Sequence, residues 1–278
     1  MRIGGAALLI LIFLAVAAPL LGTVDPSLFD AASRDLRPGE SGEITNLDGE
    51  TVKHRFLMGS DSFGRDIYSR VLYGTRVSLL VGIASALVAL SFGILCGLSA
   101  GYLRWLDGIL MRVMDGIMAI PAILIAIALV ALWRPSLSTV VLAIAIPEIP
   151  RVTRLVRSLV LSLREEPYVE AAISLGTSTP KIMFGHILPN TVAPLIVQGT
   201  YIVGFAILIE AILSFLGVGL PPDVPTWGNI MSEGRVQFVG YPHNVFFPGV
   251  FLAATVLAVN MLGDGLRDTL DPKMAKRV

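Results

Sequence analysis

Long apolar runs limit how this chain can fold more than any other feature. A helix needs about 20 largely apolar residues to cross a bilayer, and candidate runs lie at residues 3–22, 77–101, 116–133, 136–149, 187–209 and 244–263. Only 15% of the 278 residues are charged, against roughly 25% in ordinary soluble domains. We therefore predict an all-α integral membrane bundle of six transmembrane helices. The run 136–149 is the weakest, because it is short and contains Glu148.

Lysine and arginine in the short loops predict the orientation of these helices. If the N-terminus is cytoplasmic, the short outside loops carry only Arg134 and Arg235, and the inside segments carry Arg2, Arg104, Arg112, Arg151, Arg154, Arg157, Arg164, Lys181, Arg267, Lys273, Lys276 and Arg277. Because cytoplasmic loops are enriched in basic residues, we predict that both termini are cytoplasmic. The chain then divides into 1–76, a first helix with a long external loop, and 77–278, a five-helix core with a cytoplasmic loop at 158–190.

The first apolar run has a second interpretation. Arg2, the apolar stretch after it and Ala15-Val16-Ala17 also match a cleavable signal peptide. Cleavage would leave the other five helices oriented as before. We favour a retained helix, because the run continues to Gly22 and reaches spanning length.

The segment between the fourth and fifth predicted spans, 151–190, carries several helix signals. Pro167 suits a first helical position, and Gly176 would cap a helix formed by residues 168–175. Thr179, placed before Pro180, favours the start of a second helix, and Pro189 marks a break before the fifth span. The pattern predicts a cytoplasmic helix-turn-helix.

This helix-turn-helix allows three interpretations. DNA binding is disfavoured, because the unit lies between two membrane spans and the formal net charge of the chain is zero. A solvated connecting loop is the plain alternative. We favour a docking element, because Ala171 and Ala172 would leave a smooth face that a partner can approach closely. Glu170 could make charge-assisted bonds at the rim of that face.

Four separated motifs between residues 54 and 273 carry a family resemblance. Glu170-Ala171-Ala172, Gly176 and His186-Ile187-Leu188-Pro189-Asn190 resemble the signature of ATP-binding-cassette (ABC) importer permeases. His186 stands where the broad pattern has isoleucine, and this form is typical of the dipeptide/oligopeptide/nickel family. The spacing between His54 and Gly59 departs from the family. Similar stretches are Gly64-Arg65-Asp66, Leu213-Ser214-Phe215-Leu216-Gly217, and Leu266-Arg267-Asp268 with Asp271-Pro272.

The resemblance implies the C-type permease subunit of a peptide importer in the bacterial inner membrane. It implies a second homologous permease, two cytoplasmic ATPases and an external solute-binding protein as partners. Nickel chelates or glutathione-like solutes are alternative substrates within the family. The helix-turn-helix would be the coupling helix that seats in an ATPase, and the residues implied for coupling are Glu170, Ala171, Ala172, Gly176, His186, Leu188 and Pro189.

The chain itself lacks an energy-transducing motif. A phosphate-binding loop needs lysine after glycine, and no lysine here follows one. The three histidines are scattered, and Cys96 is the only cysteine. We therefore expect no catalytic residue, cofactor or metal site in this chain, with ATP and Mg²⁺ held by partner ATPases. A self-sufficient secondary transporter or channel is the alternative from another class.

Polar residues inside the predicted spans give further candidates. Glu210 would lie about 10 Å from the outer membrane boundary at 1.5 Å per residue. Glu210 and Asn260 are candidates for the solute path, although Glu210 could instead hold helices together or be protonated and structural. Asp115 and Asp264 are predicted to pair with arginines three residues away, Arg112 and Arg267. Pro121 and Pro147 would kink their helices.

The segment before the second span has its own pattern. Phe63, Ile67, Val71 and Gly74 form a helical stripe within residues 61–76, with charged residues elsewhere around the turn. We predict an amphipathic helix along the outer membrane interface, where it would anchor the chain or lie near a docked binding protein.

Overall fold

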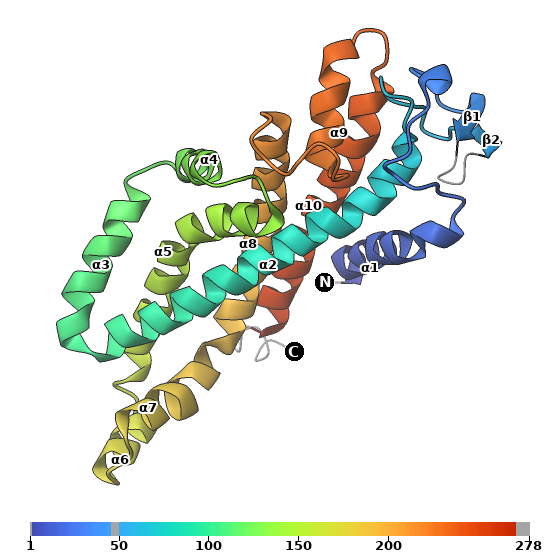
Figure 1. Ribbon diagram of the computed structural model, residues 1–278. Coiled ribbons are helices and arrows are strands. Elements are labelled where there is room, and N and C mark those ends of the chain that lie inside the picture. Colours follow the sequence, from blue (N-terminus) through green and yellow to red (C-terminus); the bar gives the residue numbers. More distant parts are fainter. Residues whose placement is uncertain (1, 46–49, 271–278) are drawn as a thin grey trace.

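The computed structural model describes residues 2–45 and 50–270 as an elongated helical bundle (Figure 1). Lys273, Lys276, Arg277 and the Asp271-Pro272 motif lie outside the described residues. A hairpin pairs β1 (Ser41–Thr45) antiparallel with β2 (Thr51–Arg55). The α-helices are α1 (Arg2–Ala17), α2 (Ile67–Tyr102), α3 (Arg104–Met118), α4 (Ala122–Leu132), α5 (Leu137–Leu163), α6 (Pro167–Ser174), α7 (Thr179–Lys181), α8 (Val192–Phe215), α9 (Trp227–Gly234) and α10 (His243–Leu270).

Among the described residues, four helical segments are long and apolar enough to cross a membrane: Arg2–Leu20, Ile67–Tyr102, Thr179–Phe215 and His243–Leu270. The pair α3 and α4 makes a fifth candidate if it is one span, bent by 86° just before Pro121 caps α4. The chain is thus a multi-pass membrane protein with four to five candidate spans, fewer than the six predicted. The predicted fourth span lies in α5, which does not qualify because its charges begin with Glu148 and Arg151.

Glycines allow α2 and α5 to pack closely. Three glycines of α2 are spaced four residues apart and therefore share one helix face. A β-carbon built on them would lie 2.4, 2.5 and 2.6 Å from valine β-carbons of α5, in the pairs Gly93–Val152, Gly97–Val156 and Gly101–Val160. Small residues let membrane helices approach in this way, so any larger residue must push the two helices apart.

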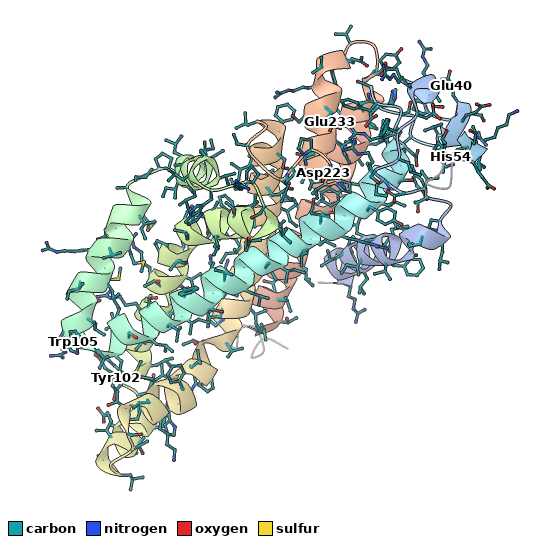
Figure 2. All side chains as sticks on the ribbon, viewed as in Figure 1. Glu40, His54, Tyr102, Trp105, Asp223 and Glu233 are labelled. Atoms are coloured by element: carbon teal, nitrogen blue, oxygen red, sulfur yellow. The ribbon has the colours of Figure 1, made fainter. Side chains whose placement is uncertain are left out.

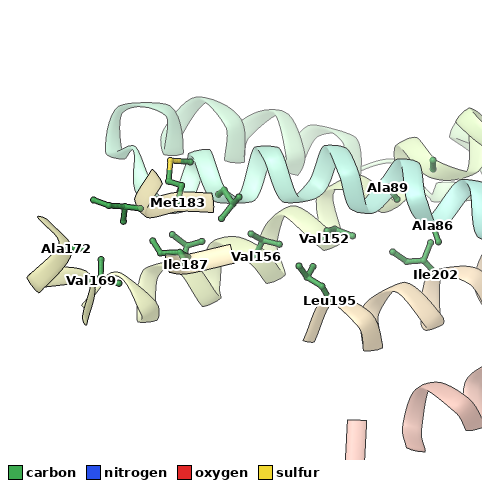
Figure 3. Packing of buried hydrophobic residues seen from close by; sticks show 14 residues of the cluster. Ala86, Ala89, Val152, Val156, Val169, Ala172, Met183, Ile187, Leu195 and Ile202 are labelled. Atoms are coloured by element: carbon green, nitrogen blue, oxygen red, sulfur yellow. The ribbon is translucent and has the colours of Figure 1, made fainter. Parts of the chain in front are cut away.

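The buried core continues from these helices into the end of the molecule that holds α6 and α7 (Figure 3). Val152 and Val156 of α5 belong to the same cluster as Val169 and Ala172 of α6 and Ile187 of the turn before α8. The short helices after α5 are therefore packed onto the bundle, at the end opposite the β-hairpin (Figure 1).

The segment before α2 differs from the prediction. Helix α2 begins at Ile67 and runs without a break through the predicted second span, so the proposed boundary between residues 76 and 77 lies inside a helix. Ile67 and Val71 are fully buried against Trp227 of α9. The prediction of a separate interfacial helix is wrong, because protein covers this stretch on nearly every side. Arg70 is one of the charged residues that were predicted to lie away from the apolar stripe of this helix, yet it is only 1% exposed.

Arg70 is the centre of a buried ion cluster. Its Nη1 donates to Asp61 at 2.6 Å and to Glu233 of α9 at 2.7 Å, and Arg65 also contacts both carboxylates. Figure 2 places Glu233 at the same end of the molecule as Glu40 and His54, opposite Tyr102 and Trp105. The cluster therefore ties the segment before α2 to α9, at the end of the molecule that holds the β-hairpin.

We expect Arg70→Met to destabilise the protein by about 3 kcal/mol, the order of a broken buried ion pair. Glu233 would keep only its contact with Arg65, and Asp61 would lose a buried partner. Thermal unfolding of the detergent-purified protein measures the loss. Arg134→Met is the control, because Arg134 is exposed. Equal melting temperatures for the two variants would contradict a stabilising role for the cluster.

Candidate functional site

The segment between α5 and α8 folds as the helix-turn-helix that its prolines and glycine predict. Pro167 occupies the first turn of α6, and Gly176 adopts a φ of +75° just past its end. The amide of Gly176 donates to Ile173 O at 2.9 Å, and that of Thr177 donates to Ala172 O at 3.0 Å. These bonds satisfy carbonyls at the helix end, as a left-handed glycine cap does.

The second half of the segment joins α7 to α8 without a straight helix. A π-helical turn (Ile182–Ile187) and a 3-10 turn (Leu188–Thr191) lie between them. Pro189 is in the 3-10 turn, where the sequence predicted a break. Helix α5 continues to Leu163, so the first six residues of the predicted loop 158–190 are helical.

The exposed face of α6 is not the face that was predicted. Glu170 and Ala171 are exposed, whereas Ala172 is 7% exposed and packs into the core cluster with Ile182. Successive helical residues point about 100° apart, so the two alanines cannot share one outward face. The prediction that Ala172 lies on a docking surface is wrong. The outward apolar side chains are Ile173, 51% exposed, and Leu175 just past the helix end, 86% exposed; the sequence pattern predicted neither of them.

The other residues implied for coupling lie on or beside the turns. Gly176 and Pro189 are exposed, while His186 and Leu188 are half-buried. Asn190 links the two halves, since its Nδ2 donates to His186 O at 2.7 Å and to Tyr168 Oη at 3.2 Å. Burial, and then the nearby carboxylate of Glu166, raise the pKa of Tyr168, which keeps its hydroxyl neutral.

A groove with a mainly apolar lining and a few polar side chains follows α8 on one side of the bundle. Its larger part, about 620 Å³, is lined by Leu155 of α5 and by Asn190, Ala193, Pro194, Val197, Gln198, Arg267 and Leu270. A second part of about 230 Å³ shares Val197, Gln198 and Arg267 and adds Thr200, Tyr201, Asn260, Gly263 and Asp264. The shared lining makes the two parts one continuous groove between α8 and α10.

The two polar residues predicted for a solute path occupy different surroundings. Asn260 lines the groove. Glu210 is fully buried and accepts a hydrogen bond from Ser214 Oγ, one turn later in α8, at 2.8 Å. Of the two, only Asn260 is placed where a solute in the groove could meet it.

The acidic residues near the inner boundary pair differently from the prediction. Asp115 of α3 accepts from Arg154 of α5 at 2.5 Å, not from Arg112. Asp107, about two helical turns earlier, is held by Arg157 through Nε and Nη2 at 2.5 and 2.6 Å. Helix α3 lies beside α5, so an arginine of α5 reaches Asp115, which the same-helix rule assigned to Arg112. In the described part of the chain, Asp264 makes no ion pair with Arg267.

Comparison with known families gives one clear match. Residues 89–276 match the family described as "Binding-protein-dependent transport system inner membrane component". The match covers α5, the helix-turn-helix, α8 and α10, which carry both the groove and the exposed face of α6.

Named relatives are similar over most of the chain. A "probable peptide ABC transporter permease protein" of Sinorhizobium fredii is 48% identical, over 99% of this chain and 89% of the relative. A dipeptide transport system permease of Alkalihalophilus pseudofirmus is 47% identical over 84% of this chain and 77% of its own. A glutathione transport system permease of Pectobacterium atrosepticum is 47% identical over 78% and 72%.

A solved structure supports the fold. The inward-facing MetNI methionine ABC transporter contains a chain that matches with a TM-score of 0.57 at 18% identity. The match covers 72% of this chain and 96% of that one. At this identity the similarity concerns the fold alone.

Proposed function

Because the chain belongs to the family of binding-protein-dependent transport system inner membrane components, and is a permease subunit of an ABC importer, we propose that it forms half of a membrane path for short peptides. The observation that carries the substrate class is the similarity, over most of the chain, to relatives named as peptide and dipeptide permeases. The glutathione permease among the relatives keeps a glutathione-like tripeptide as the second candidate.

We further propose six spans, counting α3 with α4 as one and α5 as another. Helix α5 can count as a span although it is charged, because Arg151 is paired with Glu148, and Arg154 and Arg157 are paired with acids of α3. Both termini then lie in the cytoplasm with α6, and the β-hairpin lies outside.

Uptake is proposed to be driven by partner subunits. The exposed face of α6, with Glu170, Ala171 and Leu175, would seat in one of two cytoplasmic ATPases that hold ATP and Mg²⁺. Gly176 and Pro189 would fix the angle of this element. A homologous permease would complete the path, and an external binding protein would deliver the solute.

Reconstitution of the complete transporter in vesicles tests the function. Tripeptide uptake that needs ATP, the ATPases and the binding protein, and that vanadate blocks, is the expected result. Uptake by this chain alone, driven by an ion gradient, would show a secondary transporter instead. Competition by glutathione or by a nickel chelate at the concentration of the peptide would reassign the substrate.

Cysteine labelling checks the proposed orientation. In a Cys96→Ala background, we expect Lys53→Cys on β2 to react with a membrane-impermeant thiol reagent in intact spheroplasts. Ser174→Cys on α6 should react only after permeabilisation. Both positions are exposed, so access to the reagent depends on the side of the membrane. The reverse pattern would invert the topology.

A further inference from the structure

One arginine lies at mid-membrane depth with much of its side chain uncovered. The Cζ atom of Arg151 is 5.5 Å from the ring centroid of Phe205 in α8. Phe205 is ten residues before the outer end of α8, or about 15 Å, which is half of a bilayer core of roughly 30 Å. The Arg151 side chain is nevertheless 42% exposed. Charged groups at this depth face a water path or other protein in place of lipid.

Neighbouring side chains hold this guanidinium in a fixed position. Both oxygens of the fully buried Glu148 accept from Nη1 of Arg151, at 3.1 and 3.3 Å. On the other side, Phe205 is stacked with Tyr201, with ring centroids 6.1 Å apart and planes 13° apart. Tyr201 lines the groove together with Asn260. Arg151 is thus linked through Phe205 to a side chain of the groove.

The contact with Glu148 uses only one nitrogen of Arg151. Within the described residues, no hydrogen bond engages Nε or Nη2, the two donors on one edge of the guanidinium. Arg157 lies six residues later in the same helix and uses that same edge to hold both oxygens of Asp107. Two parallel N–H donors at this edge match the geometry of a carboxylate.

We propose that Arg151 binds the carboxylate of the transported solute, which is the C-terminal carboxylate if the solute is a short peptide. The assignment rests on the proposed peptide function. Glu148 already offsets the charge of Arg151, so the open edge can recognise a carboxylate by hydrogen bonding without the full attraction of an unpaired cation. A transport path needs such moderate binding, because the solute must also leave. Tyr201 offers an apolar ring beside the bound group.

Uptake of paired substrates tests the assignment in the complete reconstituted transporter. Trialanine and its C-terminal amide are compared under identical conditions with the same binding protein. We expect Arg151→Gln to lower the ratio of free-acid to amide uptake about tenfold, as for one lost charged hydrogen bond. Arg151→Lys keeps a cation beside Glu148 but lacks the two-donor edge, so its ratio should fall as well. Arg154→Gln, in the same helix, should keep the wild-type ratio.

Other outcomes would overturn the assignment. If Arg151→Gln and Arg151→Lys lower uptake of both peptides equally, Arg151 supports assembly or pairs with a carboxylate of the partner permease. The site is also rejected if the wild-type transporter carries both peptides and no Arg151 variant changes the ratio of free-acid to amide uptake. If the wild type carries neither peptide, the proposed substrate class itself fails, a result that is distinct from a failure of Arg151.

Discussion

Replacement of Gly97 by leucine is expected to leave little folded protein in the membrane. A β-carbon at this position would already lie 2.5 Å from the β-carbon of Val156 and 2.8 Å from the carbonyl oxygen of Thr153. Overpacking of a well-packed core costs about 1–3 kcal/mol, and here a backbone atom is among the obstructions. We expect at least a tenfold fall in the yield of monodisperse protein on size-exclusion chromatography after detergent extraction.

Gly116→Leu is the matched control for this variant. Gly116 also lies in a helix, but an added β-carbon there meets no atom within 4 Å. Both substitutions carry the same change in helix propensity and hydrophobicity, so a difference between them reports the contact of α2 with α5. Similar yields for the two variants would mean that α2 and α5 do not pack as closely as described.

The sequence predicts the local features of this molecule well and its long-range contacts poorly. Pro167 and Gly176 act on their own neighbours, so the short helix between them could be predicted from residue types alone. The spacing of Gly93, Gly97 and Gly101 was visible within the second apolar run. Nothing in that run identifies the valines of α5 as its partner, because contact between distant segments is decided by the whole bundle.

The positions and partners of charged residues were also hard to predict from the sequence, as Arg151 shows. Its position after an apolar run predicted the start of a cytoplasmic loop, since loop arginines follow spans in that way. The helix instead continues through it to Leu163, and Arg151 reaches the level of Phe205 in α8. Asp115 was likewise assigned to a same-helix arginine, whereas Arg154 of a neighbouring helix binds it. Pairing rules within one helix give way when another helix brings a charge closer.

A bulky substitution on the exposed face of α6 is the strongest test of the proposed docking of an ATPase there. Ala171 is exposed and lies one turn before Leu175, whereas Ala172 faces the core. We expect Ala171→Trp to lower ATP-driven uptake more than tenfold, because the indole fills the space that a seated ATPase would need. The ATPase should no longer co-purify. Thermal unfolding of the isolated permease should be unchanged, since the new side chain points away from the bundle.

Ala172→Trp separates docking from folding. This substitution forces an indole into the cluster with Val169 and Ile182, so we expect a lower melting temperature of the permease itself. Gly176→Val should lower uptake less than Ala171→Trp and the melting temperature less than Ala172→Trp. A left-handed backbone costs residues other than glycine about 1–2 kcal/mol, and the substitution should tilt the element without adding bulk to its face. Glu170→Ala should lower ATP-driven uptake the least of the four variants, because an exposed charge at the rim is screened by solvent. Full uptake by Ala171→Trp, with the ATPase bound normally, would move the docking surface away from α6.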